Sequence, residues 1–379
     1  MSAGPLRGVR IIDLTTVLMG PFATQILGDY GADVIKIEAP GGDNTRGIGP
    51  ARNRGMAAGF LHINRNKRSL VLDLKQAAGR EALLKLVADA DVLVYNVRPQ
   101  AMARLGLDYE AVRAANPNII YVGVYGYGQR GPYAPRPAYD DLIQGAVALP
   151  TLGMLAGADA PRYVPSAMAD RVVGIAASGA ITAALFHRER TGEGQSIEVP
   201  MFETMAQFML GDHMSGHSFD PPAGPTGYAR LLNEYRRPYK TLDGYLCVLV
   251  YNDKQWQNFF AMIGSPEIME TDPRFNSITA RTENIRDLYK MLAEIFATRT
   301  TAEWQAALEA ADIPVMPMHT IESLMDDPHL SAVDFLQTVE HPTEGMMRSN
   351  SVPSNWSGRR STATEWRGLS RKTEEFRGN

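Results

Sequence analysis

The chain has 379 residues, a length that favours two domains over one. Its formal net charge of −4 at pH 7 does not support nucleic-acid binding as the main task. Its apolar runs are shorter than the ~18 residues of a membrane span, and its first residues lack the pattern of a signal peptide. The single cysteine, Cys247, excludes an intrachain disulfide and a cysteine metal cluster, so we predict a cytoplasmic protein without a metal site and without a membrane partner.

Strand and helix patterns alternate between residues 9 and 125. Apolar runs predict buried strands at residues 9–14, 33–38, 69–74, 92–96 and 119–125. Helices are predicted between them, at residues 20–30, 79–90, 101–104 and 109–115. The alternation favours an α/β fold with a parallel sheet, covered by helices on both faces and connected by right-handed crossovers.

The turn after the first strand bears on the kind of nucleotide site this fold could hold. Glu38 ends the second strand, where dinucleotide-binding folds often carry a ribose-binding acid. However, residues 14–21 lack the G-x-G-x-x-G sequence that cradles a pyrophosphate. We therefore expect a Rossmann-like domain without an NAD site.

A basic segment precedes the third predicted strand and contains Arg65, Lys67 and Arg68. Two interpretations fit these side chains. They form a solvated turn, or they contact the phosphate groups of a ligand. The pattern alone leaves both open.

Residues 172–186 form an apolar run that predicts a long helix buried on all sides, because it has no polar face. Asp170 stands at its start, and a segment with basic residues and glycines, 187–195, ends it before a strand at 196–199. An aspartate in this place is a favoured N-cap, since its carboxylate accepts hydrogen bonds from the first free amides. The same place also suits an ionised nucleophile.

The second half of the chain changes character after a helix predicted at 202–214. Residues 216–228 are rich in proline and glycine and predict an interdomain linker. Residues 239–250 predict a hairpin with an Asp243-Gly244 turn, and helices are expected at 253–263, 281–297 and 301–311. This mixture predicts a small α+β domain.

A set of short motifs runs in one order through most of the chain. They are Gly20-Pro21, the segment 27–38 (LGDYGADVIKIE), Asn66-Lys67-Arg68-Ser69, Leu72-Asp73, the segment 91–96, Arg104-Leu105-Gly106, Gly126-Tyr127-Gly128, Gly131-Pro132, Asp170, Arg188, Thr191-Gly192, Gly194-Gln195 and Asp243-Gly244. With this ordered set the chain resembles the family III CoA transferases, which include formyl-CoA transferase and the carnitine-type transferases. α-Methylacyl-CoA racemase shares their fold.

The resemblance implies an architecture. It implies a large Rossmann-like CoA-binding domain built from both chain ends, residues 1–215 and 326–379, joined by the linker 216–228 to the small α+β domain 229–325. It also implies a homodimer whose two subunits interlock like rings. The reaction partners would be an acyl-CoA and a carboxylic acid, with coenzyme A entering as a thioester substrate and no cofactor bound permanently.

The resemblance also implies the site. Asp170 takes the place of the family's nucleophile, which would carry an anhydride and then a CoA thioester. Tyr139 is implied to line the thioester pocket, although a packing role explains it equally well. Contacts with CoA are implied for residues close to predicted strand ends: Val17, Leu18, Met19, Leu72, Asp73, Lys75, Asn96, Arg98 and Arg104.

An acyl-CoA racemase or epimerase is the alternative. That branch removes and returns the α-proton of an acyl-CoA with a histidine and an aspartate, and the place of its histidine is taken here by Tyr139. A phenol with a pKa near 10 is a poor base near neutral pH. Transfer is therefore favoured over racemisation.

The acceptor acid is less clearly indicated. The glycine-rich loop that formyl-CoA transferases have before Asp243 is replaced by residues 228–237, which argues against oxalate. Arg230, Arg236 and Arg237 lie in this stretch. They either bind the second carboxylate of a dicarboxylic acceptor or are solvated surface residues. The predicted reaction is CoA transfer to a small or dicarboxylic acid.

Overall fold

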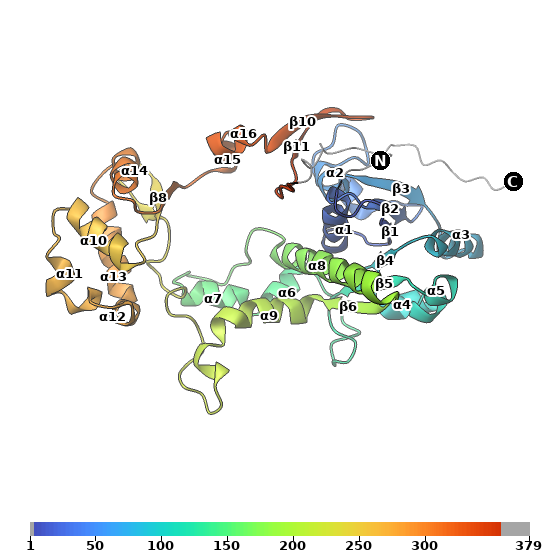
Figure 1. Ribbon diagram of the computed structural model, residues 1–379, viewed down its shortest axis with the longest axis horizontal. Helices are drawn as coiled ribbons and strands as arrows, with labels where there is room; N and C mark the ends of the chain where they lie inside the picture. The colour runs from blue at the N-terminus through green and yellow to red at the C-terminus, as the bar shows by residue number, and fades with distance from the viewer. Residues whose placement is uncertain (1–3, 358–379) are drawn as a thin grey trace. The chain divides into compact units, whose positions relative to one another are not determined.

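The computed structural model describes residues 4–357, which fall into two compact units (Figure 1). Unit 1 contains the chain up to Val147, Val164–Phe208 and the segment from Pro328 onward, and unit 2 contains Ala148–Tyr163 and Met209–Asp327. Two boundaries differ from the predicted ones. Residues 148–163 belong to unit 2 instead of the domain at 1–215, and unit 2 begins at Met209, before the predicted linker. Residues 358–379 of the predicted returning segment lie outside the described residues.

Unit 1 is built on a six-stranded parallel sheet with the strand order β3-β2-β1-β4-β5-β6. The strands are β1 (Arg10–Asp13), β2 (Asp33–Glu38), β3 (Lys67–Val71), β4 (Val92–Tyr95), β5 (Ile120–Tyr125) and β6 (Ser196–Pro200). A strand is present for each one predicted between residues 9 and 125, but β3 is Lys67–Val71 where 69–74 was predicted. The strand predicted at 196–199 is β6. The chain reverses its direction of travel across the sheet between β1 and β4, where sheets of this kind place a ligand crevice.

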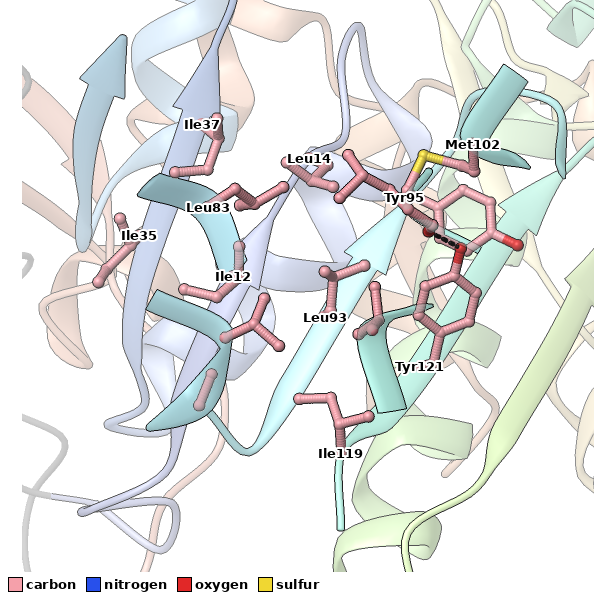
Figure 2. Close-up of a cluster of buried hydrophobic side chains, with 14 of the residues drawn as sticks. Ile12, Leu14, Ile35, Ile37, Leu83, Leu93, Tyr95, Met102, Ile119 and Tyr121 are labelled. Carbon is pink, nitrogen blue, oxygen red and sulfur yellow. Dashed lines mark hydrogen bonds between the residues drawn. The ribbon is translucent and has the colours of Figure 1, made fainter. Parts of the chain in front are cut away.

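Helices cover both faces of the sheet (Figure 1), as the alternation predicted. On one face, alternate strand residues such as Ile12, Leu93 and Tyr121 form a buried cluster with Leu83 of α3 and Met102 of α4 (Figure 2). On the other face, α1 contacts β1, β2 and β4, and α8 contacts β5 and β6. The helices of unit 1 before the long one are α1 (Met19–Asp29), α2 (Ala58–Asn64), α3 (Ala77–Ala88), α4 (Pro99–Arg104), α5 (Tyr109–Ala115) and α6 (Asp140–Ala146), with a 3-10 turn at Asn44–Gly47.

The long helix α8 (Met168–Thr191) exceeds the predicted 172–186 at both ends and is buried along one face only. Ile175 and Phe186 on its outer face are 58% and 67% exposed, so the prediction of a helix buried on all sides was wrong for the single chain. By length and composition α8 could also cross a membrane, but the core helices of soluble proteins pass the same test. Its inner stripe packs against α1 and consists of small and apolar residues: Ala169, Val173, Gly174, Ala177, Ser178, Ile181 and Ala184.

The C-terminal segment completes unit 1. The turn residue Glu344 is only 4% exposed and accepts hydrogen bonds from the backbone and side-chain amides of Asn53 at 3.2 and 3.1 Å. Met347 packs against a buried cluster around Phe60. The elements of this segment are α16 (Pro328–Ala332), β10 (Leu336–His341) and β11 (Gly345–Asn350), the last two forming an antiparallel hairpin.

Unit 2 combines a small antiparallel sheet with several helices. The predicted hairpin at 239–250 is the β7–β8 pair, and Asp243-Gly244 lies in its turn. Buried aromatic residues, among them Trp256, Phe259 and Trp304, form its core. The sheet contains β7 (Tyr239–Lys240), β8 (Tyr245–Val248) and β9 (Val315–Pro317). The helices are α7 (Leu149–Leu155), α10 (Asp253–Met262), α11 (Ile268–Thr271), α12 (Ile278–Glu283), α13 (Ile285–Phe296), α14 (Thr301–Ala310) and α15 (Ile321–Met325), and α9 (Met201–His213) leads into the unit from β6.

Candidate active site

The loops that follow β1 and β4 meet at the carboxyl edge of the sheet, on either side of the point where the strand order reverses. Asn96, which follows β4, joins them. Its side-chain carbonyl accepts the Thr16 N–H at 3.0 Å, and its amide donates to the Thr16 carbonyl at 2.7 Å. The structure therefore brings Asn96 and the loop 17–19 together, with the Asn96 side chain engaged in holding that loop.

Val17 adopts an unusual backbone conformation at the tip of the first loop. Its φ of 69° lies in the left-handed region, where a β-branched residue is an outlier. The Val17 N–H lies 3.3 and 3.4 Å from the two carboxylate oxygens of Asp43. Leu18 then precedes α1 without a side-chain cap, so the first amides of that helix remain open at its positive end. This arrangement suits an anionic group beside the loop.

Two buried ion pairs lie directly behind this loop. Lys36 Nζ donates to the Thr15 carbonyl at 2.7 Å and pairs with Asp43 at 3.0 Å. Lys67 Nζ pairs with Asp13 at 3.0 Å, and Asp13 in turn accepts the Thr15 N–H at 2.8 Å. All four charged side chains are completely buried. The loop backbone is thus held through Thr15 and Val17 by charges from three neighbouring strands and the segment after β2.

In the basic segment before the third strand, both interpretations were wrong for Arg65 and Lys67, whereas Arg68 is exposed as a solvated residue would be. Lys67 is buried in the pair with Asp13, and Arg65 is buried in a pair with Asp29 at 2.6 Å. Only Arg68 is exposed. The reason is the register of β3, which starts at Lys67, because successive residues of a strand point to opposite faces. Neither Arg65 nor Lys67 is solvated or free to bind a phosphate.

The buried pair of Asp13 and Lys67 remains ionised at neutral pH. Burial alone would raise the pKa of Asp13, but the charges of Lys67 and Lys36 and the hydrogen bond from Thr15 lower it to about 2. Burial lowers the pKa of Lys67 to about 8, against the opposing effect of Asp13. The pKa of Lys67 thus stays far above that of Asp13, so both groups remain ionised at pH 7.

Glu38 is also occupied. Arg46 donates to its two oxygens at 2.6 and 2.7 Å. Burial opposes ionisation of Glu38, yet the hydrogen bonds and charge of Arg46 lower its pKa to about 2. Since both oxygens are taken, this acid is not free to bind a ribose, in agreement with the missing glycine fingerprint.

The remaining residues predicted to contact CoA lie around the ends of β3 and β4. Leu72 packs against the same apolar cluster as Leu14. Asp73 accepts the Lys75 N–H at 3.0 Å, and Arg98 donates to the Pro135 carbonyl at 3.1 Å. The side chains of Lys75 and Arg104 are exposed and form no ion pair with any residue from 4 to 357. These two cations are available for phosphate groups.

Asp170 is the third residue of α8, whose N-cap is Ala167. Asp170 therefore does not cap this helix with its side chain, contrary to the N-cap interpretation. Its N–H donates to Asp140 Oδ2 at 2.9 Å. Asp140 thus supplies from α6 the acceptor that a capping side chain of α8 would otherwise provide, and the other Asp140 oxygen accepts from Gln144 at 2.6 Å.

The Asp170 carboxylate is half-buried, and no residue from 4 to 357 donates a hydrogen bond to it. Burial and the nearby charge of Asp140 raise its pKa to about 6, while Arg171 acts in the opposite direction. We expected the first amides of the helix to donate hydrogen bonds that keep this carboxylate ionised, but none of the amides of residues 4–357 does so. A carboxylate that is poorly stabilised in this way is a stronger nucleophile than a fully hydrogen-bonded one.

Close contact between α8 and α1 brings Asp170 towards the loop 17–19. A Cβ at Gly174 would lie 2.9 Å from the Met19 carbonyl and from the Phe22 ring, so only glycine allows this approach. The Arg171 guanidinium covers the Phe22 ring at 4.3 Å. Because Asp170 lies one helical turn before Gly174, it shares the face that approaches α1.

Tyr139 and the three arginines of 228–237 occupy different surroundings. Tyr139 precedes α6, next to the Asp140 that binds the Asp170 N–H, and it is 70% exposed. In unit 2, Arg236 and Arg237 are exposed as solvated residues would be. Arg230 is buried and does not fit the solvated interpretation.

Several residues of this site were not identified from the sequence. Asp140, Lys36 and Asp43 were not singled out. The available signal was a charged residue at an alternate position of an otherwise apolar strand, as Asp13 and Lys36 are. Such a residue needs a buried partner, but the sequence does not say which one.

Comparison with known proteins is consistent across the chain. The profile of CoA-transferase family III matches residues 6–367. The chain is 34% identical to the succinyl-CoA:glutarate CoA-transferase of Mus musculus over 358 residues, which cover 93% of this chain and 80% of that protein. It is 36% identical to the acetyl-CoA:oxalate CoA-transferase of Acetobacter aceti over 344 residues, 88% of this chain and 85% of that protein. The crystal structure of Rv3272 from M. tuberculosis matches with a TM-score of 0.81 and 30% identity over 96% of both chains.

Proposed function

The chain belongs to CoA-transferase family III, and from this premise we propose that it moves CoA from an acyl-CoA thioester to a small or dicarboxylic acid on Asp170. The observation that carries the proposal is the half-buried Asp170 carboxylate, which accepts no hydrogen bond from residues 4–357 and has a pKa raised to about 6 by burial and Asp140. At pH 7 most of it is ionised and reactive. Relatives named for glutarate and for oxalate, which are both dicarboxylic acids, match to a similar extent, and this supports a dicarboxylic acceptor.

The first half of the reaction loads the enzyme. An Asp170 oxygen attacks the thioester carbonyl of the donor, the C–S bond breaks, and CoA leaves as a thiolate while Asp170 becomes a mixed anhydride. The thiolate then attacks the Asp170 side-chain carbonyl of that anhydride. The donor acid leaves as a carboxylate, and Asp170 is left as a CoA thioester.

The second half reverses these steps with the acceptor. The acceptor carboxylate attacks the Asp170 thioester carbonyl and releases the CoA thiolate, which forms a second anhydride. The thiolate attacks the acceptor's carbonyl carbon, and the Asp170 carboxylate leaves. No proton is gained or lost in the cycle, so transfer needs no general base.

Other residues have supporting roles in this proposal. Each tetrahedral oxyanion needs hydrogen-bond donors. The first amides of α6 are candidates, because this helix has no side-chain cap and begins at Asp140, which accepts the Asp170 N–H. Lys75 and Arg104 suit the phosphates of CoA. The loop 17–19 and the open start of α1 suit the passage of CoA towards Asp170.

Trapping the covalent intermediate tests this function. The protein is incubated with candidate acyl-CoAs, treated with borohydride and analysed by peptide mass spectrometry. Reduction of an anhydride or thioester at Asp170 converts it to homoserine, and an Asp170→Asn variant gives the matched control. A donor that supports transfer without modifying Asp170 would overturn the mechanism.

Racemisation of an acyl-CoA is the second candidate, and it is less well supported because an exposed tyrosine, Tyr139, stands where a catalytic histidine would be needed. Exchange of the α-proton with deuterium from the solvent distinguishes the two activities. Transfer predicts no exchange, whereas racemisation requires it.

We also propose that the protein forms an interlocked homodimer and that it is cytoplasmic. Large apolar side chains of α8 and α9 that are exposed in the single chain, such as Ile175, Phe186 and Leu210, support association of two copies. The lone, half-buried Cys247 is compatible with a reducing compartment. Solution sizing tests the dimer, which should not dissociate to a folded monomer on dilution.

A further inference from the structure

Arg230 differs from every other buried lysine and arginine of residues 4–357. The others each form an ion pair with an acid, whereas Arg230, 8% exposed, forms none. The paired ones are Lys36 with Asp43, Arg65 with Asp29, Lys67 with Asp13 and Arg281 with Asp253.

The contacts of Arg230 hold its guanidinium without neutralising it. Its Nη2 donates to the hydroxyl of Tyr289, a buried residue of α13, at 3.1 Å. Its Cζ lies over the Tyr251 ring, 4.6 Å from the ring centre. The partners are a neutral hydroxyl and an aromatic ring, so the charge itself has no counter-ion in unit 2.

A buried guanidinium of this kind needs an anion. Arginine stays protonated at any physiological pH, and a buried charge is strongly unfavourable unless it is paired. One guanidinium N–H is engaged with Tyr289, and the planar fork of an arginine has further N–H groups with which it binds both oxygens of a carboxylate. Tyr251 is itself 46% exposed, so one neighbour of Arg230 is open to solvent.

We propose that Arg230 is a carboxylate-binding residue for the acid substrates, held in place by Tyr289 and Tyr251, and that it selects dicarboxylic over monocarboxylic acids. This inference rests on the proposed function for the identity of the ligand. It assigns different roles to three arginines of one segment, because Arg236 and Arg237 are exposed and have no comparable surroundings.

A binding experiment tests the site without relying on catalysis. The melting temperature of the purified enzyme is measured with increasing glutarate and with pentanoate, which has the same chain length and one carboxylate. Glutarate is expected to raise the melting temperature of the wild-type protein and of Asp170→Asn, since binding stabilises the folded state. Arg230→Met should abolish this rise, whereas Arg237→Met, an exposed arginine of the same segment, should keep it.

Kinetics supply a second readout. Arg230→Met is expected to raise KM for glutarate by about 10- to 100-fold, the range for a lost charge-assisted hydrogen bond, with KM for pentanoate and for the acyl-CoA unchanged. Arg230→Lys keeps the positive charge but lacks the planar guanidinium, so its KM for glutarate should lie between those of wild type and Arg230→Met. The acid-free Arg230→Met protein should be no less stable than wild type, because it removes an unpaired buried charge.

Three results would overturn the proposal. They are a glutarate-dependent stabilisation that survives in Arg230→Met, equal changes in KM for glutarate and pentanoate, and a loss of acyl-CoA affinity, which would mean that the anion is a CoA phosphate. If Asp170→Asn retained transfer activity while Arg230→Met lost glutarate binding, the proposed mechanism would fail and the carboxylate site would stand.

Discussion

Asp13 and Asp170 are two aspartates of unit 1 whose surroundings shift their pKa values in opposite directions. Asp13 is completely buried, yet its pKa is lowered to about 2, because Lys67, Lys36 and threonine donors outweigh the effect of burial. Asp170 is only half-buried, yet its pKa is raised to about 6, because burial is reinforced by the charge of Asp140. The nature of the neighbours, more than the depth of burial, decides how stable each carboxylate is.

The difference corresponds to two uses of the same side chain. Asp13 is surrounded by donors and stabilises the loop that follows β1. Asp170 receives no hydrogen bond on its carboxylate from residues 4–357, and its position is held through its backbone N–H by Asp140. Holding a residue through its main chain leaves the side chain reactive, which is what nucleophilic catalysis requires.

The largest effect is expected from replacing Asp170, the reactive one of the two aspartates. Asp170→Asn should lower the rate of CoA transfer by roughly 10³-fold or more, because an amide cannot form the anhydride. Stability should change little, since the Asp170 carboxylate accepts no hydrogen bond from the described part of the chain. Transfer assays with a competent acyl-CoA, together with thermal unfolding, measure both. Near-normal transfer by this variant would remove the basis of the contrast.

Removing Lys67, the partner of Asp13, should mainly lower the stability of the protein. Lys67→Met leaves Asp13 buried without its nearest cation, which should reduce the free energy of unfolding by about 3–5 kcal/mol. Arg68→Met is the matched control, because its pair with Asp33 is exposed and contributes at most about 1 kcal/mol. Urea unfolding followed by circular dichroism measures the two. Similar losses in both variants would show that burial of the Lys67 pair has no special importance.

The pH dependence of the donor step follows from the pKa of Asp170. Only the carboxylate attacks the thioester, so kcat/KM for the acyl-CoA should be constant above the pKa of about 6 and fall as pH decreases below it. Asp140→Asn keeps an oxygen acceptor for the Asp170 N–H but removes the charge that raises this pKa. The fall should therefore move to lower pH, giving a few-fold advantage at acidic pH.

Asp141→Asn serves as its control, because Asp141 is an exposed neighbour on the same helix and is not among the groups that shift the pKa of Asp170. Profiles from pH 4.5 to 8 for the two variants and wild type make the comparison. Coincident acidic limbs for Asp140→Asn and wild type would contradict the role given to Asp140.

The smallest effect is expected at Val17, in the loop after β1 that the buried ion pairs of Asp13 and Lys36 hold in place. Asparagine tolerates left-handed backbone better than valine, so Val17→Asn should stabilise the protein by about 0.5–1 kcal/mol. Val97 is similarly exposed (39% against 41%) and is not among the residues with positive φ. Val97→Asn should therefore give no gain. Differential unfolding of the two variants measures this, and equal effects would mean that Val17 is not strained.

Local patterns predicted much of this fold. The strands of unit 1, its crossover helices and the hairpin of unit 2 follow from apolar periodicity and turn residues, which depend on near neighbours. The partners of Asp13, Lys36 and Lys67 depend on strand register and order, which bring together residues far apart in the chain. The outer face of α8 was misjudged because its apolar composition does not say how much of it a single chain can cover.

The candidate site was predictable only in part, because its contacts also join residues that are far apart in the chain. Asp170 was identified through a family resemblance, and its environment was not. Its neighbour Asp140 lies 30 positions earlier, and only the packing of α6 beside α8 makes the two meet. Likewise, nothing local distinguishes Arg230 from Arg237. Burial without an acid appears only once unit 2 is folded.

The buried contact between Glu344 and Asn53 has a consequence for biosynthesis. Unit 1 is completed by residues from Pro328 onward, so it cannot close until unit 2 has been translated. At about 5–20 residues per second, the ribosome needs roughly 6–24 seconds to pass from Phe208 to Pro328. For that interval the nascent chain exposes the apolar surface around Phe60 that Met347 will later cover. That stage of synthesis is where a chaperone has the most to protect.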